Sequence, residues 1–416
     1  MSSRIGILFV GFGGAVSTTS VIASLAIAKG ISPPYGLYTE TNISTVKDGV
    51  LDRHNQKPIK EVLSLLQFND LVFGGWDIED QSLYDASLEQ GIVPPELIHQ
   101  LAPELKLFHP LPGVFSSTYV KNLQGKHLIP AATLWEVVQV LQQNIREFQQ
   151  FHQCERVLVV NTSSTEAYNP FTSVHQTLAS FEEGLRQNDS SISPVQVYAY
   201  AALASQAPYI NFTPSLAEEA PALRELAAKT KTPFAGKDGK TGQTLLKTAL
   251  APLFRLKNLR VEGWFSTNIL GNKDGLVLDD PGSLKSKIMT KSSVLDQILG
   301  YSPYHKVNIN YYPPRGDNKE AWDNVDFLGI LGMPMQLKIN FLCRDSILAA
   351  GAVLDLIRLL EYSARHGESG VQEQLSFFFK SPLTIIPDRQ PIHDFFKQEG
   401  MLKDWLREKA FGVKYN

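Results

Sequence analysis

The chain has few cysteines, no long apolar run and no excess of positive charge, and each absence excludes a class of protein. Only Cys154 and Cys343 occur among 416 residues, so a disulfide scaffold and a four-cysteine zinc site are excluded, and a reducing cytoplasm is the expected setting. No run of about 18 apolar residues occurs, so no membrane span is expected. Lysine and arginine number 39 against 42 acidic residues, a net charge of −3, which disfavours a general nucleic-acid binder. An anionic substrate must therefore meet a local cluster of lysines. No spacing of His, Asp and Glu indicates a metal site.

Predicted strands and helices alternate through the first half of the chain. The apolar segment Ile5–Val10 predicts a buried parallel strand, and a glycine turn interrupts it too soon for a signal peptide. Small and apolar residues at helical spacing then predict a helix over residues 17–29. Further strands are predicted at residues 35–39, 71–77 and 156–160, with an amphipathic helix at 133–151. This alternation, to about residue 230, predicts an α/β fold with a doubly wound parallel sheet.

The pattern changes in the second half. Strands with few intervening helices are predicted at residues 261–265, 306–312, 325–330 and 336–342, which favours an antiparallel or mixed sheet in a second domain. A long apolar helix at residues 345–362 and another at 372–379 could return to the first domain. Residues 390–391 and the charged tail after Lys403 are expected to be peripheral.

A glycine-rich turn separates the first predicted strand from the first predicted helix. Gly11, Gly13 and Gly14 would let the backbone approach a pyrophosphate, and the helix that follows would supply N–H donors and a positive dipole end. The spacing departs from G-x-G-x-x-G, and a tight structural turn is the alternative. The acidic residue that usually accompanies such a turn could be Glu40 or Asp77, and either could instead cap a helix or lie in a solvated loop.

A second loop, at residues 236–244, combines glycine, lysine and threonine before a predicted helix. Thr241 and Thr244 offer hydroxyls, and the backbone N–H groups of Gly242 and Gln243 lie in the first turn. This arrangement suits a phosphate. A plain threonine-capped helix is the alternative.

Three lysines further along the chain could meet an anion. Lys287 and Lys291 are four residues apart and share a face if the segment is helical, although a solvated basic face is the alternative. Lys380 ends an apolar run, so partial burial could lower its pKa and suit it to proton transfer. A cation at a helix C-terminus is the other interpretation of Lys380. Asp345 is expected to cap the long helix at residues 345–362.

Taken in order, these segments resemble the myo-inositol-1-phosphate synthase family, from Gly11 to about Lys380. Residues 236–244, GKDGKTGQT, resemble that family's Asp-x-x-Ser-Gly-Gln-Thr phosphate loop, and residues 270–275, LGNKDG, resemble its Leu-Gly-Asn-Asn-Asp-Gly. Ser-Lys-x-x-x-Lys-Ser, Gly-Asp-Asn-Lys, Asp-Ser-Ile-Leu-Ala-Ala and Phe-Phe-Lys-Ser-Pro-Leu follow in the family's order. A chance run of six such motifs is improbable.

The resemblance implies a Rossmann-type doubly wound parallel sheet that binds NAD, over residues 1–235 and 350–416. A mixed α+β domain for catalysis and tetramer assembly, at residues 236–349, would interrupt it. The resemblance also implies a reaction in which NAD oxidises C5 of glucose 6-phosphate and the C6 proton is removed. An intramolecular aldol then closes the ring, and the same NADH reduces the ketone. The expected partners are a sugar phosphate and further copies of the chain in a homotetramer, without nucleic acid or membrane. A monovalent or divalent cation could also be required.

Carried over residue by residue, the resemblance assigns each motif a role. The catalytic ammoniums would stabilise the negative charge on an enolised ketone, and the carboxylates would orient them. The catalytic set would comprise Lys287, Lys319, Lys380, Asp317 and Asp345. The substrate phosphate would be held by Thr241, Gly242, Gln243, Thr244 and Lys291. NAD would contact Gly11, Gly13, Gly14, Ala15, Val16, Asp77, Asn161, Thr162, Ser163, Asp238, Asn272 and Asp274.

The sequence also departs from the family pattern. Ala15 and Val16 stand where the family's glycine loop commonly ends in two asparagines, and Lys273 replaces an asparagine beside Asp274. These changes leave open a related cyclase or isomerase that acts on another sugar phosphate. A non-catalytic NAD-binding sensor is a further alternative, which the complete set of lysines disfavours.

Overall fold

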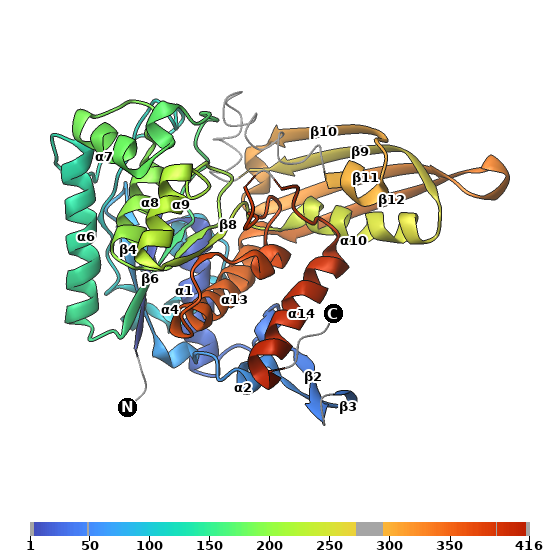
Figure 1. Cartoon of the computed structure of the whole chain (residues 1–416), viewed down its shortest axis with the longest axis horizontal. Coiled ribbons are helices and arrows are strands. Elements are labelled where there is room, and N and C mark those ends of the chain that lie inside the picture. The colour runs from blue at the N-terminus through green and yellow to red at the C-terminus, as the bar shows by residue number, and fades with distance from the viewer. Residues whose placement is uncertain (1–3, 48–49, 272–293, 388, 413–416) are drawn as a thin grey trace.

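The computed structural model describes residues 4–47, 50–271, 294–387 and 389–412, and its larger layer is a parallel sheet of seven strands in the order β13-β8-β7-β6-β1-β4-β5 (Figure 1). The strands are β1 Ile5–Val10, β4 Leu71–Asp77, β5 Leu111–Pro112, β6 Arg156–Asn161, β7 Tyr209–Asn211, β8 Pro233–Gly236 and β13 Gly370–Val371. Strands β4 and β5 lie on one side of β1, and β6, β7 and β8 lie on the other. The strand order therefore reverses at β1, and the predicted doubly wound sheet is confirmed.

Side chains of β1 alternate between two apolar cores, one on each face of this sheet. Ile5, Ile7 and Phe9 belong to one core, and Leu8 and Val10 belong to the other. The first core is covered by α1 Ala15–Ala28, α3 Leu83–Gln90, α4 Pro95–Gln100, α5 Ala102–Leu105 and α13 Asp345–Arg365. The second is covered by α6 Leu134–Phe151, α7 Leu178–Gln187, α8 Pro194–Ala204 and α9 Pro221–Thr230. Because both faces are covered, all six residues of β1 are buried.

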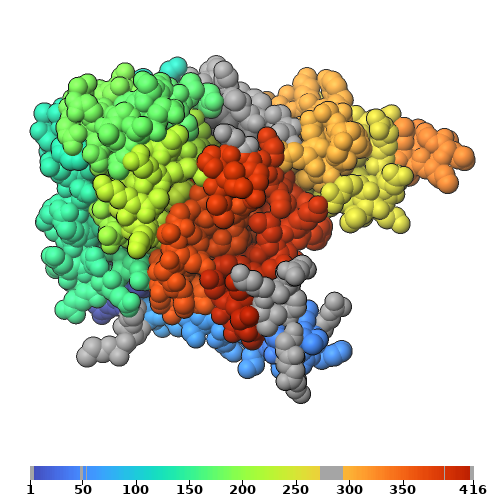
Figure 2. Space-filling model, in the orientation of Figure 1, coloured from blue at the N-terminus to red at the C-terminus, as the bar shows by residue number. Residues whose placement is uncertain are grey.

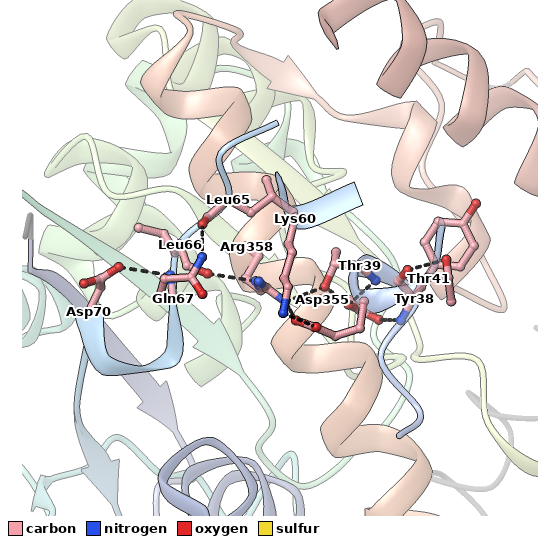
Figure 3. A network of polar contacts seen from close by, with 11 residues as sticks. Tyr38, Thr39, Thr41, Lys60, Leu65, Leu66, Gln67, Asp70, Asp355 and Arg358 are labelled. Atoms are coloured by element: carbon pink, nitrogen blue, oxygen red, sulfur yellow. Dashed lines mark hydrogen bonds and ion pairs between the residues drawn. The ribbon is translucent and has the colours of Figure 1, made fainter. Parts of the chain in front are cut away.

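The strand predicted at residues 35–39 is wrong. The chain there forms the short 3-10 helix η1 (Tyr38–Glu40), and the strand that follows, β2 (Asn42–Lys47), pairs with β3 (Val50–Pro58) in a separate hairpin. The Asp355 carboxylate accepts hydrogen bonds from the backbone N–H groups of Tyr38 (2.6 Å) and Thr39 (2.9 Å), and from the Thr39 hydroxyl (2.6 Å) (Figure 3). These N–H groups are therefore not available to a strand ladder. The short elements α2 (Ile59–Val62) and η2 (Phe68–Asp70) complete this part of the chain, and η3 (Ser173–His175) lies further on, between β6 and α7.

A buried guanidinium lies beside that carboxylate. Arg358 is 1% exposed, and its guanidinium donates to the Leu66 carbonyl (2.9 Å), the Thr39 hydroxyl (2.7 Å) and the Glu40 carboxylate (2.8 Å) (Figure 3). Lys60 forms a second ion pair with Glu40, at 2.6 Å. The cluster joins α13 to two segments near the start of the chain, at residues 38–41 and 60–67.

The second layer is a mixed sheet of four strands in the order β10-β9-β11-β12 (Figure 1). Its strands are β9 Arg260–Leu270, β10 Tyr304–Tyr311, β11 Asn318–Leu328 and β12 Pro334–Arg344, with the turns η4 Pro313–Arg315 and η5 Ile330–Gly332 between them. Strand β9 is parallel to β10 and antiparallel to β11, which confirms the mixed sheet. Helix α10 (Gly242–Leu256) packs against one face, where Phe254 meets Trp264 and Val325. Strand β11 starts at Asn318, earlier than predicted, so Lys319 lies on a strand. The domain boundaries at residues 235/236 and 349/350 stay predictions.

The C-terminal tail is not peripheral, and this prediction is wrong. Helix α14 (Phe395–Phe411) buries Leu402 and Leu406 to 1% exposure or less. The indole of Trp405 packs edge-on against Tyr362 of α13, with ring centroids 5.7 Å apart. Charged residues between these apolar positions hid the buried side in the sequence. The helix predicted at residues 372–379 is the 3-10 helix η6 (Glu373–Phe378), against which α14 packs.

Two further findings concern the described residues alone. None of their helices has both the length and the apolar composition needed to cross a membrane. Cys154 and Cys343 are buried and free.

Candidate active site

A cavity of about 720 Å³ lies at the carboxyl ends of β1, β4 and β6 and is lined from both sheets. Val10, Asp77 and Thr162 come from these three strand ends, and Tyr311 and Asp317 come from the side of the mixed sheet. In doubly wound sheets, ligands bind at this edge, where the strand order reverses. The predicted site residues that line the cavity are Gly11, Gly13, Gly14, Ala15, Val16, Asp77, Thr162, Ser163, Asp238, Thr241, Asp317, Asp345 and Lys380.

The glycine turn is built for close approach of a ligand to the backbone. Gly11 has φ +81°, and a Cβ at this position would lie 3.1 Å from the Cα of Ser163. The N–H of Gly14 donates to the Gly11 carbonyl (3.0 Å), which closes the turn. Helix α1 then begins at Ala15, and no side chain caps its first-turn N–H groups. The turn therefore fits the diphosphate of a dinucleotide such as NAD.

Of the two acidic residues that could accompany this turn, Asp77 is the one beside it. The Oδ2 atom of Asp77 accepts a hydrogen bond from the N–H of Gly13 (2.8 Å), and Asp77 lines the cavity. Glu40 instead forms ion pairs with Lys60 and Arg358. The structure thus favours Asp77 as the cofactor-side carboxylate.

We expect Asp77→Ala to weaken NAD binding roughly tenfold or more, because the charge-assisted hydrogen bond that holds Gly13 is lost. Glu40→Gln is the matched control and should leave the dissociation constant of NAD unchanged. Calorimetric titration of both variants with NAD measures the difference. If Asp77→Ala kept its affinity for NAD while Glu40→Gln lost it, Glu40 and not Asp77 would be the carboxylate on the cofactor side.

Asn161 lies behind the cavity wall and is absent from its lining. Its Nδ2 donates to the Asn211 side chain (3.1 Å), while its Oδ1 accepts from the N–H (3.2 Å) and the hydroxyl (2.7 Å) of Ser163. The hydroxyl of Thr162 lies 2.6 Å from that of Ser17 on α1. Asn161 therefore orients Ser163, and Thr162 and Ser163 form the cavity wall.

The loop at residues 236–244 leads from β8 into α10. Thr241 occupies the N-cap position but makes no side-chain cap hydrogen bond, so the alternative of a plain threonine-capped helix is wrong. Gly242 has φ +56°, and a Cβ there would lie 3.5 Å from both the Nζ of Lys319 and the Oδ1 of its partner Asp345. The start of α10 thus faces an ammonium group, an arrangement that fits a phosphate.

The side chain of Gln243 is bound to the mixed sheet. Its Oε1 accepts from the Nδ2 of Asn268 (2.7 Å), and its Nε2 donates to Asp323 (3.1 Å). Asp323 also accepts from the Trp264 indole (2.6 Å) and the Ser266 hydroxyl (2.7 Å). Gln243 and Thr244 are buried and absent from the cavity lining. What Gln243 can offer a phosphate is therefore its backbone N–H.

Two buried lysine–carboxylate pairs stand beside this loop. The Nζ of Lys380 lies 3.1 Å from Asp238, and that of Lys319 lies 3.1 Å from Asp345. Both lysines are 6% exposed. The N–H of Lys380 also donates to the Asp238 carbonyl (2.6 Å), which fixes Lys380 against the loop. The burial predicted for Lys380 is confirmed.

Asp345 does not cap the long helix, and this prediction is wrong. Helix α13 starts at Asp345 without a side-chain cap, because this carboxylate is paired with Lys319. Asp317 reaches the first turn instead, since it accepts from the hydroxyl (2.7 Å) and the N–H (3.4 Å) of Ser346. Asp317 therefore fixes the start of α13 beside the cavity.

Five residues of the sequence analysis lie outside the described part of the chain. They are Asn272, Lys273, Asp274, Lys287 and Lys291. The roles expected of these residues stay predictions.

The structure adds buried ionisable groups that no sequence motif indicated. Burial raises the pKa of Glu166, which lines the cavity, to about 7. Burial lowers the pKa of Lys247 to about 8, and its Nζ lies 2.8 Å from the Nε2 of His305. Their partners are far away in the sequence, so no local pattern could mark them. No group of three or more His, Cys, Asp or Glu side chains that could hold a metal ion occurs among the residues described.

The sheet order and the glycine turn at this cavity define a Rossmann-type dinucleotide-binding protein. A family model of NAD-binding proteins, described as myo-inositol-1-phosphate synthase, matches residues 5–407. The chain belongs to this family, and the predicted resemblance and the predicted cofactor NAD are confirmed.

Similar proteins agree in sequence and in structure. The chain is 45% identical to inositol-3-phosphate synthase 1 of Bacteroides thetaiotaomicron, over 98% of this chain and 95% of the relative. It is 31% identical to inositol-3-phosphate synthase of Mesembryanthemum crystallinum, over 97% of this chain and 85% of the relative. The crystal structure of inositol-3-phosphate synthase from Caenorhabditis elegans matches with a TM-score of 0.90 at 29% identity, over 99% of this chain and 86% of the other.

Proposed function

We propose that the protein converts glucose 6-phosphate to an inositol phosphate with NAD as a catalytic, regenerated cofactor. The observation that carries this proposal is the shared cavity, which brings together the glycine turn, residues 238, 239 and 241 of the phosphate loop, and the buried pair of Lys380 and Asp238. Asp345 also lines the cavity, and its partner Lys319 lies behind that carboxylate, outside the lining. The relatives named above are inositol-3-phosphate synthases, and the identity to them extends over nearly the whole chain.

Residues at the sheet edge would hold NAD. The first-turn N–H groups of α1 and the turn at Gly11 suit its diphosphate, with Asp77 fixing Gly13 behind them. When bound, NAD supplies an acceptor for a hydride from a sugar carbon and returns that hydride later. Thr162 and Ser163 line the cavity beside the turn.

The start of α10 would hold the substrate phosphate. The N–H groups of Gly242, Gln243 and Thr244 belong to its first turn, where a helix offers donors and partial positive charge. Lys319 adds an ammonium beside Gly242. The family resemblance implies the same role for Lys291. An anion at this place is stabilised by both groups of donors.

Lys319 and Lys380 would stabilise the charge that develops on the sugar. Removing a proton next to a ketone leaves negative charge on the ketone oxygen, and an Nζ atom can donate a hydrogen bond to it. The paired carboxylates, Asp345 and Asp238, keep these ammoniums in place inside the protein. The enolate carbon then attacks the aldehyde of the same sugar, which closes the ring without loss of atoms.

The purified protein with glucose 6-phosphate and NAD should form product without net NADH. Periodate-released phosphate measures the inositol phosphate, and absorbance at the NADH maximum measures the redox balance. Absence of product under all ammonium and divalent-ion conditions would contradict the proposal. A faster reaction with another hexose or heptose phosphate would favour the related cyclase suggested by Ala15 and Val16.

We also propose that the chain assembles as a homotetramer through the outer face of the mixed sheet. Trp264 and Val325 are cross-strand partners that face α10, so Phe265 and its neighbours point away from that helix. On this outer face Phe265, Trp322 and Leu342 are 42%, 49% and 58% exposed. Figure 2 shows this sheet projecting from the body of the molecule. Apolar side chains in such a position are typical of subunit interfaces.

The double variant Phe265→Glu/Trp322→Glu should dissociate this assembly, because charges would be buried in the interface. Sedimentation velocity should show a tetramer for the wild-type protein and a smaller species for the variant. Tyr35→Glu, at an aromatic residue that is 88% exposed elsewhere, is the matched control. A monomeric wild-type protein, or equal dissociation by the control, would contradict this interface.

Cys154 and Cys343 are both free thiols, which supports a location in the reducing cytoplasm.

A further inference from the structure

The side chain of Lys240 extends from the phosphate loop on the side that faces away from the cavity. Its neighbours Asp238, Gly239 and Thr241 line the cavity, whereas Lys240 does not and is 7% exposed. Its backbone N–H donates to the carbonyl of Phe378 on η6 (2.7 Å). The side chain therefore runs into the protein behind the loop, where its Nζ meets Gln398 of the C-terminal helix α14.

The ammonium of Lys240 lies in a neutral site. Its Nζ donates to the Oε1 of Gln398 on α14 and lies over the rings of Phe377 (5.9 Å) and Phe395 (5.4 Å). Among the described residues, no carboxylate forms an ion pair with it. Burial lowers the pKa of Lys240 to about 7, and burial together with Lys240 lowers the pKa of His393 to about 4. Burying a lysine without a counter-charge is costly, so aliphatic packing alone does not account for its place here.

The acceptor for Lys240 is held in one orientation. Gln398 is fully buried, and its Nε2 donates to the carbonyl of Ile392 (2.6 Å), which turns its Oε1 toward Lys240. The side chain of Asp394 caps α14 at the N–H groups of Phe396 (3.1 Å) and Lys397 (3.2 Å). The first turn of α14 is thus a fixed support for the loop.

A second contact joins the same turn to the helix that follows the loop. Arg255, on α10, donates to Asp394 at 2.9 Å. Helix α14 is therefore bound both to the loop and to α10, the helix that follows the loop. A displacement of α14 would displace the donors that meet the substrate.

We propose that Lys240 is a positioning residue that ties the phosphate loop, through Gln398, to the first turn of α14. The C-terminal helix is then part of the machinery that binds the substrate phosphate, although α14 itself does not line the cavity. The inference rests on the proposed function, since it takes the loop as the phosphate site. The tie acts on substrate and transition state alike, so it should govern KM and leave turnover of bound substrate nearly unchanged.

The test uses the full chain with Lys240→Met, Gln398→Leu and the double variant. Each single change should raise KM for glucose 6-phosphate, and the Kd measured by calorimetry, roughly tenfold, because each loses the same charged hydrogen bond. The KM of the double variant should be no higher than the larger of the two single-variant KM values, since both changes break the same hydrogen bond. The kcat and the NAD affinity should change less than about threefold, as expected for an interaction equal in ground and transition states.

Two further variants separate positioning from general destabilisation. Gln398→Glu keeps an acceptor for Lys240 but loses the donor to the Ile392 carbonyl, so KM should lie between the wild-type value and that of Gln398→Leu. Lys403→Met, at a partly exposed lysine of α14 paired with Glu399, should leave KM unchanged. A fall in kcat at constant KM, or additive effects in the double variant, would overturn the inference. If the wild-type protein binds glucose 6-phosphate without cyclising it, the proposed function fails, and the binding data still decide the role of Lys240.

Discussion

Replacing Lys380 with methionine should lower kcat by roughly two to three orders of magnitude, as expected for the loss of one donor to a developing oxyanion. Lys380 is buried, lines the cavity and is held by both the carboxylate and the carbonyl of Asp238. Its ammonium can therefore meet a sugar oxygen without rearrangement. NAD affinity should change little, because the glycine turn belongs to a different loop. Steady-state kinetics with glucose 6-phosphate measure the effect.

Replacement of Lys380 also removes the ion-pair partner of Asp238. Lys380→Met leaves Asp238 as a buried charge, which by itself destabilises a protein by about 3–5 kcal/mol. The double variant Lys380→Met/Asp238→Asn removes both charges and should recover stability while staying inactive. Near-normal kcat in either variant would show that Lys380 does not touch the reacting oxygen.

Replacing Arg358 with methionine should destabilise the protein by about 3–5 kcal/mol, as expected when one partner of a buried charged network is removed. The change would leave the Leu66 carbonyl without this donor and the Glu40 carboxylate with Lys60 alone (Figure 3). It would also remove a positive charge that lowers the pKa of Asp355, which burial raises to about 6. Urea unfolding at neutral pH measures the free-energy difference.

Arg365→Met on the same helix is the matched control. Arg365 pairs with Glu361 at 3.4 Å, and its side chain is 35% exposed while that of Glu361 is 1% exposed. Because Glu361 keeps its ion pair with Arg156 at 3.0 Å, the loss of Arg365 should cost less stability than the loss of Arg358. KM for glucose 6-phosphate should be unchanged in both variants where they remain folded. Equal destabilisation by the two changes would contradict the importance assigned to the network.

Local sequence patterns were sufficient for the central strands. Strands β1 and β4 are short apolar runs that end in glycine turns or an acid, and the structure has them where they were predicted. Residues 35–39 were missed because the acceptor for their N–H groups is Asp355, 316 positions from Thr39 in the sequence. The buried side of α14 was missed because its charged residues dominate the local pattern, whereas its apolar contacts come from α13 and η6.

The site shows the same division between local and distant information. The motifs indicated which lysines and acids to consider, but not how they pair. Lys380 pairs with Asp238 across 142 positions, and Lys319 pairs with Asp345 across 26. The resemblance implies that Asp238 contacts NAD and that Asp345 orients a catalytic lysine, but it does not say which lysine either carboxylate pairs with. Pairing at such distances follows from the packing of whole elements, which periodicity and spacing do not contain.

The central claim is that oxidation and reduction take place on one sugar within one cavity. Glucose 6-phosphate deuterated at C5, incubated with the protein and unlabelled NAD, tests it most directly. Mass spectrometry of the product should show inositol phosphate that retains the deuterium, while free NADH carries none. Inositol phosphate without deuterium, or deuterium released into the NADH pool in proportion to turnover, would contradict the account.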